Sequence, residues 1–327
     1  MMALAMAAVL ALGAFGLAGC SGGGAVEPVT TPVPISAPVE DMGDDVGDGL
    51  VVVDMIGREV RLSGLAERVV ALMPADVETL YAIGAGDVLV GRGEYCNYPL
   101  EALEVQSVQS GFETNTEQII ALEPDLLLMT KLAQDEGQIQ QFEAAGIEVF
   151  VTDAQDIEGV YMAIGLIGQL VGKEAEAEAV VGDMRGVLTD LGARSAAAVE
   201  AAGGEPGTIY FEVSPLEFGL WTAGAGTFMN EVAELLHLRN IFSDVYDWAE
   251  ISEEQVIERD PDYILTVGMY FGDGPTPIES ILSRQGWENI AAIRNEAILN
   301  LTEDELSRPG PRLALGAQML YEFVYGG

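Results

Sequence analysis

The sequence of 327 residues is nearly half hydrophobic, and its length suits one large two-lobed unit or two domains. Its 53 acidic residues far outnumber the 14 lysines and arginines, and the formal net charge is −39. A charge of this size and sign disfavours nucleic acid as a partner, and also direct contact with an anionic lipid surface.

Residues 1–20 are mainly Met, Ala, Val, Leu, Gly and Phe, and they end in Leu-Ala-Gly-Cys20. They resemble a bacterial lipoprotein signal, in which the cysteine becomes the lipidated mature N-terminus, although the usual positive charges are missing. A transmembrane anchor is the alternative, against which the glycines and the short apolar length argue. With Cys20 lipidated, Cys96 is expected to be a buried free thiol. Residues 21–48, rich in Gly, Pro and acidic residues, predict a disordered tether.

Residues 50–156 alternate between strand and helix patterns and predict an N-terminal α/β lobe. A β-hairpin is expected at 51–62, and a helix with Asp76 as its N-cap is expected to run to Ala85. Further predicted strands lie at 69–72, 88–91, 126–129 and 148–152, and further helices at 117–122 and 135–145. Strands separated by short helices indicate a mostly parallel sheet that is covered on both faces.

Residues 157–203 lose the strand pattern. Apolar residues between Ala177 and Leu191 recur at helical spacing and predict a long helix that passes between lobes. The strand and helix patterns return in residues 204–327, which predict a C-terminal α/β lobe. Its expected elements are strands at 208–213 and 262–267 and helices at 226–236, from 252, and at the C-terminus.

One segment of the chain occurs nearly twice. Residues 117–128 read EQIIALEPDLLL and residues 254–265 read EQVIERDPDYIL, and they align without a gap. Each predicts a helix ended by a proline and followed by a buried strand. The copies are about one domain length apart, which indicates two similar α/β lobes.

Catalytic chemistry finds little support in the sequence. The single histidine, His237, lies at a predicted helix end, whereas a zinc or manganese ion normally requires two or three imidazoles. Gly-rich phosphate loops, GxSxG and HExxH are absent from the sequence. We therefore expect no enzyme activity and no cofactor.

Six segments carry a family resemblance by their order and spacing. They are ERVVALMPADVETLYAIGAGDVLVG (67–91), YCNYP (95–99), TNTEQIIALEPDLLL (114–128), GTF…NIF (226–242), WAEISEEQVIERDPD (248–262) and RPGPRL (308–313). From about Val51 to its end, the chain resembles the class III solute-binding proteins of ATP-binding-cassette importers for cobalamin, ferric siderophores and haem. The resemblance implies an α/β fold of two Rossmann-like lobes joined by a single long helix, with the ligand in the cleft between the lobes. It also implies an extracytoplasmic, lipid-anchored monomer that delivers a metal chelate to a permease dimer with its ATPase.

The resemblance assigns two sets of residues. In this family one surface glutamate per lobe docks on the permease, and the matching positions are Glu117 and Glu254; a capping box with Thr114 is the alternative for Glu117. The ligand-binding positions that match cobalamin-binding members are Tyr95, Trp248, Asp304 and Arg308, with ordinary packing as the alternative for the two aromatic residues. Phe112 and Trp221 are expected as further wall residues without an unambiguous match in the family, and Met73 is expected to touch the ligand through its thioether.

Several residues keep alternative interpretations. Arg308 either contacts the ligand or pairs with Asp304 or Glu305 at the surface. Tyr98 is expected in the core, and Arg312 is expected to help begin the terminal helix.

The few cations available to the cleft, Arg92, Arg308 and Arg284, favour cobalamin or another weakly charged chelate over a strongly anionic siderophore. Haem, with Tyr95 or Met73 as axial ligand, is an alternative, and an enzyme or sensor on the same scaffold is the rival class.

Overall fold

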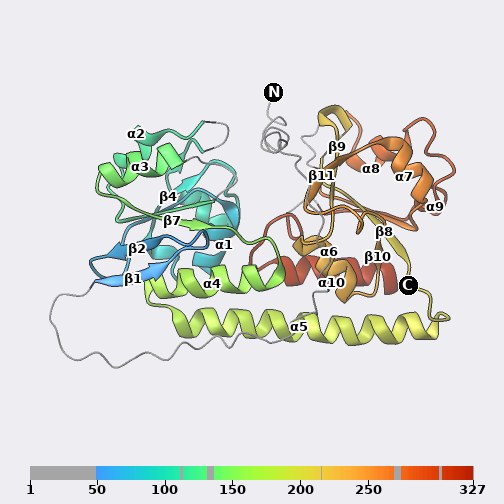
Figure 1. Cartoon of the computed structure of the whole chain (residues 1–327), viewed down its shortest axis with the longest axis horizontal. Helices are drawn as coiled ribbons and strands as arrows, with labels where there is room; N and C mark the ends of the chain where they lie inside the picture. Colours follow the sequence, from blue (N-terminus) through green and yellow to red (C-terminus); the bar gives the residue numbers. More distant parts are fainter. Residues whose placement is uncertain are drawn as a thin grey trace, which may run out of the picture.

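The computed structural model describes residues 49–110, 113–130, 136–214, 216–268, 274–301 and 304–326. They form two α/β lobes that stand on a shared base of helices (Figure 1). The predicted lipidation residue Cys20, the tether at 21–48 and the predicted wall residue Phe112 lie outside the described residues. Within the described ranges, no helix has both the length and the apolar composition needed to cross a membrane.

The first lobe contains a five-stranded parallel sheet with the order β5-β4-β3-β6-β7. A separate antiparallel hairpin, β1 with β2, confirms the hairpin prediction. The strands are β1 (Leu50–Val53), β2 (Glu59–Leu62), β3 (Val69–Ala71), β4 (Leu89–Gly93), β5 (Ser107–Val108), β6 (Leu126–Thr130) and β7 (Glu148–Thr152). The helices are α1 (Pro74–Ala82), α2 (Thr116–Ile120) and α3 (Glu136–Ala144), with 3₁₀ turns at Gly86–Val88 and Leu100–Glu104.

Alternation along the strands explains why both faces of this sheet are covered. Val69 and Ala71 of β3 enter a hydrophobic cluster that includes residues of α1 and α4. The intervening Val70, with Leu72, enters a separate cluster formed with α2 and α3. Since successive side chains of a strand point to opposite faces, an apolar run such as VVAL can serve a buried parallel strand.

The second lobe repeats this plan with a four-stranded parallel sheet of order β10-β8-β12-β13 and an antiparallel ribbon of β9 and β11. The strands are β8 (Thr208–Glu212), β9 (Leu220–Ala223), β10 (Arg239–Asn240), β11 (Trp248–Ile251), β12 (Tyr263–Thr266) and β13 (Ile298–Asn300). The helices are α6 (Phe228–Leu235), α7 (Glu253–Arg259), α8 (Pro277–Leu282) and α9 (Ala291–Arg294), with a 3₁₀ turn at Leu216–Phe218. The prediction of two α/β lobes is confirmed.

The repeated Pro-Asp dipeptide has a structural role in both lobes. The Asp125 carboxylate accepts hydrogen bonds from the backbone N–H groups of Glu67 at 2.9 Å and Arg68 at 3.1 Å, just before β3. The Asp262 carboxylate accepts one from the backbone N–H of Thr208 at 2.9 Å, where β8 begins. Each aspartate thus ties the start of its own strand to that of the neighbouring strand and helps to fix the parallel register.

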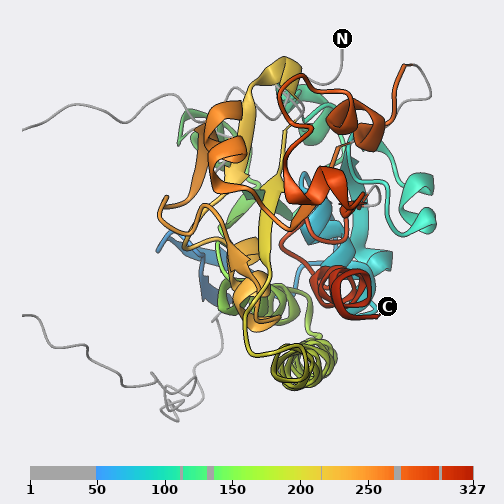
Figure 2. The same cartoon turned by 90° about the vertical axis from the view of Figure 1, so that its right-hand side faces the viewer.

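Three helices form the base on which the lobes stand: α4 (Ile157–Val171), α5 (Glu174–Ala201) and α10 (Leu313–Tyr325). The 28 residues of α5 span about 42 Å, and this helix packs against both α4 and α10. Figure 1 shows α4 under the first lobe and α10 under the second, and Figure 2 looks along the helices. The predicted single long connecting helix is therefore confirmed.

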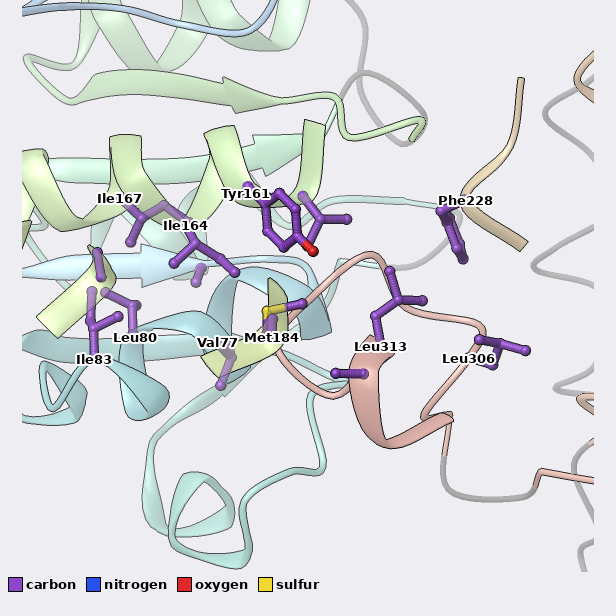
Figure 3. Packing of buried hydrophobic residues seen from close by; sticks show 14 of the residues in the cluster. Val77, Leu80, Ile83, Tyr161, Ile164, Ile167, Met184, Phe228, Leu306 and Leu313 are labelled. Carbon is purple, nitrogen blue, oxygen red and sulfur yellow. The ribbon is translucent and has the colours of Figure 1, made fainter. Parts of the chain in front are cut away.

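One hydrophobic cluster joins the base to both lobes (Figure 3). It contains Val77 and Leu80 from α1, Met184 from α5, Phe228 from α6 and Leu313 from α10, all of them buried. Because protein interiors are close-packed, the lobes cannot separate widely without exposing these side chains to water.

Candidate functional site

The start of α1 lies at the carboxyl end of the first sheet, where open α/β sheets bind ligands. Met73, a predicted wall residue, is the N-cap of α1 and is half-buried. The prediction of Asp76 as N-cap is wrong, because the helix already begins at Pro74, whose ring suits the first helical position. Asp76 and Glu78 therefore lie within the helix, and both carboxyl groups are buried.

The Glu78 carboxylate accepts hydrogen bonds from two arginines near the other end of the chain. Its Oε1 accepts from Arg308 Nη1 at 2.9 Å and from Arg312 Nη2 at 2.8 Å, and its Oε2 accepts from Arg312 Nε at 2.9 Å. The Glu78 side chain is 1% exposed and each arginine side chain 11%. Asp304 and Glu305 are buried beside the arginines. We call these five residues the Glu78 cluster.

Arg308 connects the cluster to a third predicted ligand-binding residue, Tyr95, besides Arg308 itself and Asp304. Arg308 Nη2 pairs with the Asp304 carboxylate and donates to the backbone carbonyl of Tyr95 at 3.3 Å. Arg308 Nη1 also donates to Asn97 Oδ1 at 2.9 Å. Arg308 and Asp304 form the ion pair that was considered as an alternative to ligand contact. The pair is largely buried, so the expectation that it lies at the surface is wrong. Ligand contact by Tyr95, Asp304 and Arg308 stays a prediction.

Arg312 also contacts the loop that follows β4. Its guanidinium lies 4.1 Å from the ring centroid of Tyr98, which is a cation–π geometry. Tyr98 is 43% exposed, so its expected place in the core is wrong. Arg312 is the N-cap residue of α10, as expected, but its side chain turns to Glu78 rather than to its own helix.

Asp76 is a buried carboxyl group, and its contact is with the hydroxyl of Thr152 rather than with any cation in the described part of the chain. Its Oδ2 lies 3.2 Å from Thr152 Oγ1, and the same hydroxyl lies 3.0 Å from the Met129 carbonyl oxygen. A hydroxyl has one hydrogen and cannot donate to both acceptors, so a protonated Asp76 that donates to Thr152 satisfies all three groups. Burial raises the pKa of Asp76 to about 7, against a smaller lowering by Thr152. Both observations favour a neutral acid below pH 7.

Cys96 is buried next to the end of β3, as predicted for a free thiol. Its Sγ lies 3.7 Å from the Leu72 carbonyl oxygen, which brings the Tyr95 loop beside Met73. Burial raises the pKa of the Cys96 thiol to about 12. The thiol is therefore a packing group rather than a nucleophile at neutral pH.

The two predicted tryptophans share one face of the ribbon in the second lobe. Trp221 of β9 pairs with Glu250 of β11, and Ala223 pairs with Trp248, so all four side chains lie on the same face. Trp248 meets the Phe228 ring edge-on at 5.5 Å between centroids. Both tryptophans are half-buried and leave part of their surface for another apolar group.

The other two cations considered for the cleft are already bound within their lobes. Arg92 Nε donates to the Ala102 carbonyl at 2.8 Å, and its Nη1 donates to the Gly93 carbonyl at 3.1 Å. Arg284 forms two hydrogen bonds with the Glu212 carboxylate, at 2.6 and 2.8 Å, and this pair is buried. Like Arg308, these arginines have partners in the protein.

The predicted docking glutamates occupy the same position in two equivalent helices. The side chains of Asn115 and Ser252 precede α2 and α7, and each accepts a hydrogen bond from the backbone N–H three residues later, at 3.1 and 3.4 Å. Glu117 and Glu254 are therefore the second residues of their helices, and both are exposed.

The capping-box alternative for Glu117 is wrong, because Asn115 rather than Thr114 caps α2. As an acid in a first helical turn, Glu117 still interacts with the helix dipole by about 0.3–1 kcal/mol. Hydrogen bonds from its own backbone N–H and from Ser252 lower the pKa of Glu254, so this carboxylate is ionised at neutral pH.

Two concavities, of about 460 and 320 Å³, lie beside β10 in the second lobe. Among the described residues, those predicted to bind ligand line neither of them. His237 borders the first and is exposed just beyond the end of α6, as expected for a residue at a helix end. The candidate site is therefore defined by the strand ends and by the contacts between the lobes.

Residues 69–305 match the periplasmic binding protein family. An uncharacterized ABC transporter substrate-binding lipoprotein of Bacillus subtilis is 32% identical over 275 residues, which cover 83% of this chain and 84% of that protein. A vitamin B12-binding protein of Yersinia pestis is 30% identical over 266 residues, which cover 78% of this chain and 85% of that protein. The crystal structure of a possible iron-binding, periplasmic solute-binding protein of Staphylococcus epidermidis is 29% identical, with a TM-score of 0.64, and the match covers 80% of this chain and 99% of that one.

Proposed function

Because this chain belongs to the periplasmic binding protein family, we propose that it is the extracytoplasmic substrate-binding component of an ATP-binding-cassette importer. It holds a metal chelate between its lobes and delivers it to a permease without chemical turnover. The observation that carries this proposal is the matched pair of exposed glutamates, Glu117 and Glu254, at the same position of equivalent helices. A permease with pseudo-two-fold symmetry requires two such equivalent contacts.

The proposed ligand is a weakly charged chelate of the cobalamin type. Arg92, Arg284 and Arg308 are bound to carboxylates or carbonyls of the protein, which leaves them poorly placed to neutralise a strongly anionic siderophore. The partly exposed faces of Trp221 and Trp248 suit a large, flat and partly apolar ligand. The vitamin B12-binding relative supports this class, and the possible iron-binding relative keeps a ferric chelate as the second candidate.

The remaining parts of the proposal concern the membrane. A lipid on Cys20 anchors a monomer to the outer side of the membrane, and residues 21–48 tether the lobes. The named lipoprotein of Bacillus subtilis supports the anchor. Mass spectrometry of the mature N-terminus, purified from the native host, tests it directly: diacylglyceryl-modified Cys20 is expected, and an unprocessed N-terminus contradicts it.

The docking role is tested by the double variant Glu117→Arg with Glu254→Arg, in vesicles that contain the cognate permease and ATPase. Uptake is expected to fall to the level without binding protein, since two attractive contacts become repulsive, while chelate affinity measured by calorimetry stays within about twofold of wild type. A control variant reverses two exposed acids of α5, Glu178→Arg with Glu200→Arg, and should transport normally. Normal uptake by the docking variant, or impaired affinity, refutes the assignment.

A further inference from the structure

The C-terminal part of the second lobe makes a long-range contact with the first lobe. After β13, the segment from Asp304 to Arg312 runs against the start of α1 before α10 returns beneath the second lobe (Figure 1). A side chain at Gly310 would meet Ala75 at 3.4 Å, and Leu306 and Leu313 join the cluster of Figure 3 that contains Val77. This segment is thus a second link between the lobes, besides α5.

The polar part of this link converges on one carboxylate. Glu78 accepts three hydrogen bonds from Arg308 and Arg312, at 2.8–2.9 Å, in a nearly dry environment. Hydrogen bonds between ionised groups are short and strong, and the planar guanidinium fixes their direction. Replacement of this carboxylate by a neutral group takes one ionised partner away from each arginine.

The same two arginines hold the loop that follows β4 at three points. Arg308 donates to the Tyr95 carbonyl oxygen and to the Asn97 side chain, and Arg312 covers the Tyr98 ring. Tyr95 is a predicted ligand contact on this loop. The position of a ligand-binding loop in the first lobe therefore depends on side chains that belong to the second lobe.

We propose that Glu78 is a positioning residue that clamps Arg308 and Arg312 across the two lobes and thereby holds the Tyr95 loop in its binding conformation. Glu78 itself does not contact the ligand. The consequence for binding rests on the proposed function, whereas the consequence for the loop does not. Loss of the clamp frees the loop without changing either sheet, so ligand dissociation becomes faster.

The loop is tested first, by hydrogen exchange of the ligand-free, full-length protein. In Glu78→Gln, peptides that cover residues 94–98, where the Cys96 amide donates to the Gly93 carbonyl at 3.1 Å, are expected to exchange at least about tenfold faster than in wild type, while those of β8 and β12 stay unchanged. The matched control is Glu158→Gln, which removes an equally bidentate but exposed contact with Arg185, at 2.7 and 2.8 Å. It should leave residues 94–98 unchanged.

A second variant covers the case in which Glu78→Gln fails to fold. Arg312→Lys keeps the positive charge but loses the double contact with Glu78 and the planar cover of Tyr98, and faster exchange should again be confined to residues 94–98. Exchange that is unchanged at these amides, or accelerated equally in both lobes, overturns the clamp, because the cluster would then act only on overall stability.

Binding is tested with cyanocobalamin, haemin and ferrioxamine as probes. For a probe that binds wild type, the dissociation rate is expected to rise about tenfold in Glu78→Gln and to stay unchanged in Glu158→Gln. An unchanged rate in Glu78→Gln contradicts the effect of the clamp on binding. If wild type binds none of the probes, the proposed ligand class is at fault, and the exchange experiment still decides whether the clamp exists.

Discussion

The buried carboxyl group of Asp76 makes a prediction about stability that can be worked out in sign and size. Its pKa is about 7 in the folded protein and 3.8 without the fold. Because the folded-state value is the higher one, the neutral acid stabilises the fold fully below pH 3.8, and this contribution is lost as the pH rises through 7. The difference corresponds to about 4 kcal/mol in total, of which about 2.5 kcal/mol disappears between pH 5 and pH 8.

The substitution Asp76→Asn mimics the protonated acid. Its amide can donate to Thr152 Oγ1, which in turn donates to the Met129 carbonyl, and it cannot ionise. The stability of the variant relative to wild type should therefore increase by about 2.5 kcal/mol from pH 5 to pH 8. The dipole of α1 favours a carboxylate at this position by only about 0.3–1 kcal/mol, which is too little to reverse the sign.

Urea unfolding followed by far-UV circular dichroism at pH 5, 6, 7 and 8 measures this difference, with the slope m compared to detect changes in cooperativity. Asp244→Asn is the control, since Arg259 lowers the pKa of this exposed carboxyl and its removal should bring no gain with rising pH. A relative stability of Asp76→Asn that stays flat from pH 5 to pH 8 would show that Asp76 is ionised throughout, and would refute the assignment of a neutral acid.

Three further predictions concern the exposure of single side chains. Iodoacetamide at pH 7.5 should leave Cys96 unmodified in the native protein and modify it in 6 M guanidinium, as read by peptide mapping; native labelling contradicts its burial and raised pKa. Met184→Ala should lower the free energy of unfolding by about 2–5 kcal/mol. The control Val187→Ala, at an exposed position of the same helix, should lower it by less than about 0.5 kcal/mol, and equal values for the two variants would contradict a shared core. A bound corrinoid or haemin should quench the half-buried Trp248; a signal that persists in Trp248→Phe would assign the quenching elsewhere, for instance to the buried Trp287.

Much of the fold could be predicted because its signals are local. The hairpin around Gly57, the strand at 69–72 and the long helix from Glu174 each depend on patterns within a few turns or strands. The repeat of residues 117–128 at 254–265 extended this local information to the architecture, because two similar segments imply two similar lobes. The exposed positions of Glu117 and Glu254 agree with what the family resemblance implied for these two residues.

The Glu78 cluster could not be predicted, because its partners are far apart in the chain. Glu78 is separated from Arg308 by 230 residues and from Arg312 by 234, and a single sequence does not pair such positions. The available signal was weaker: two arginines four residues apart, in RPGPR, within a chain that has few cations. Asp76 was misplaced for a different reason, since its preference for a cap position competed with that of Pro74 for the first helical turn.

The base of the molecule limits how such a protein can release its ligand. The helices that carry Glu117 and Glu254, α2 and α7, continue into strands that are central or next to central in their sheets, and both sheets stand on α5 and on one common core. The distance between Glu117 and Glu254 is therefore set by a helix and a packed interior rather than by a flexible hinge. A permease that binds both glutamates must work against this packing to change the angle between the lobes, so we expect the change to be small. Small changes are sufficient if Tyr95 contacts the ligand as predicted, because the hydrogen bond from Arg308 to the Tyr95 carbonyl crosses the lobe boundary. A slight rotation then breaks the hydrogen bonds of the clamp before it disturbs either sheet.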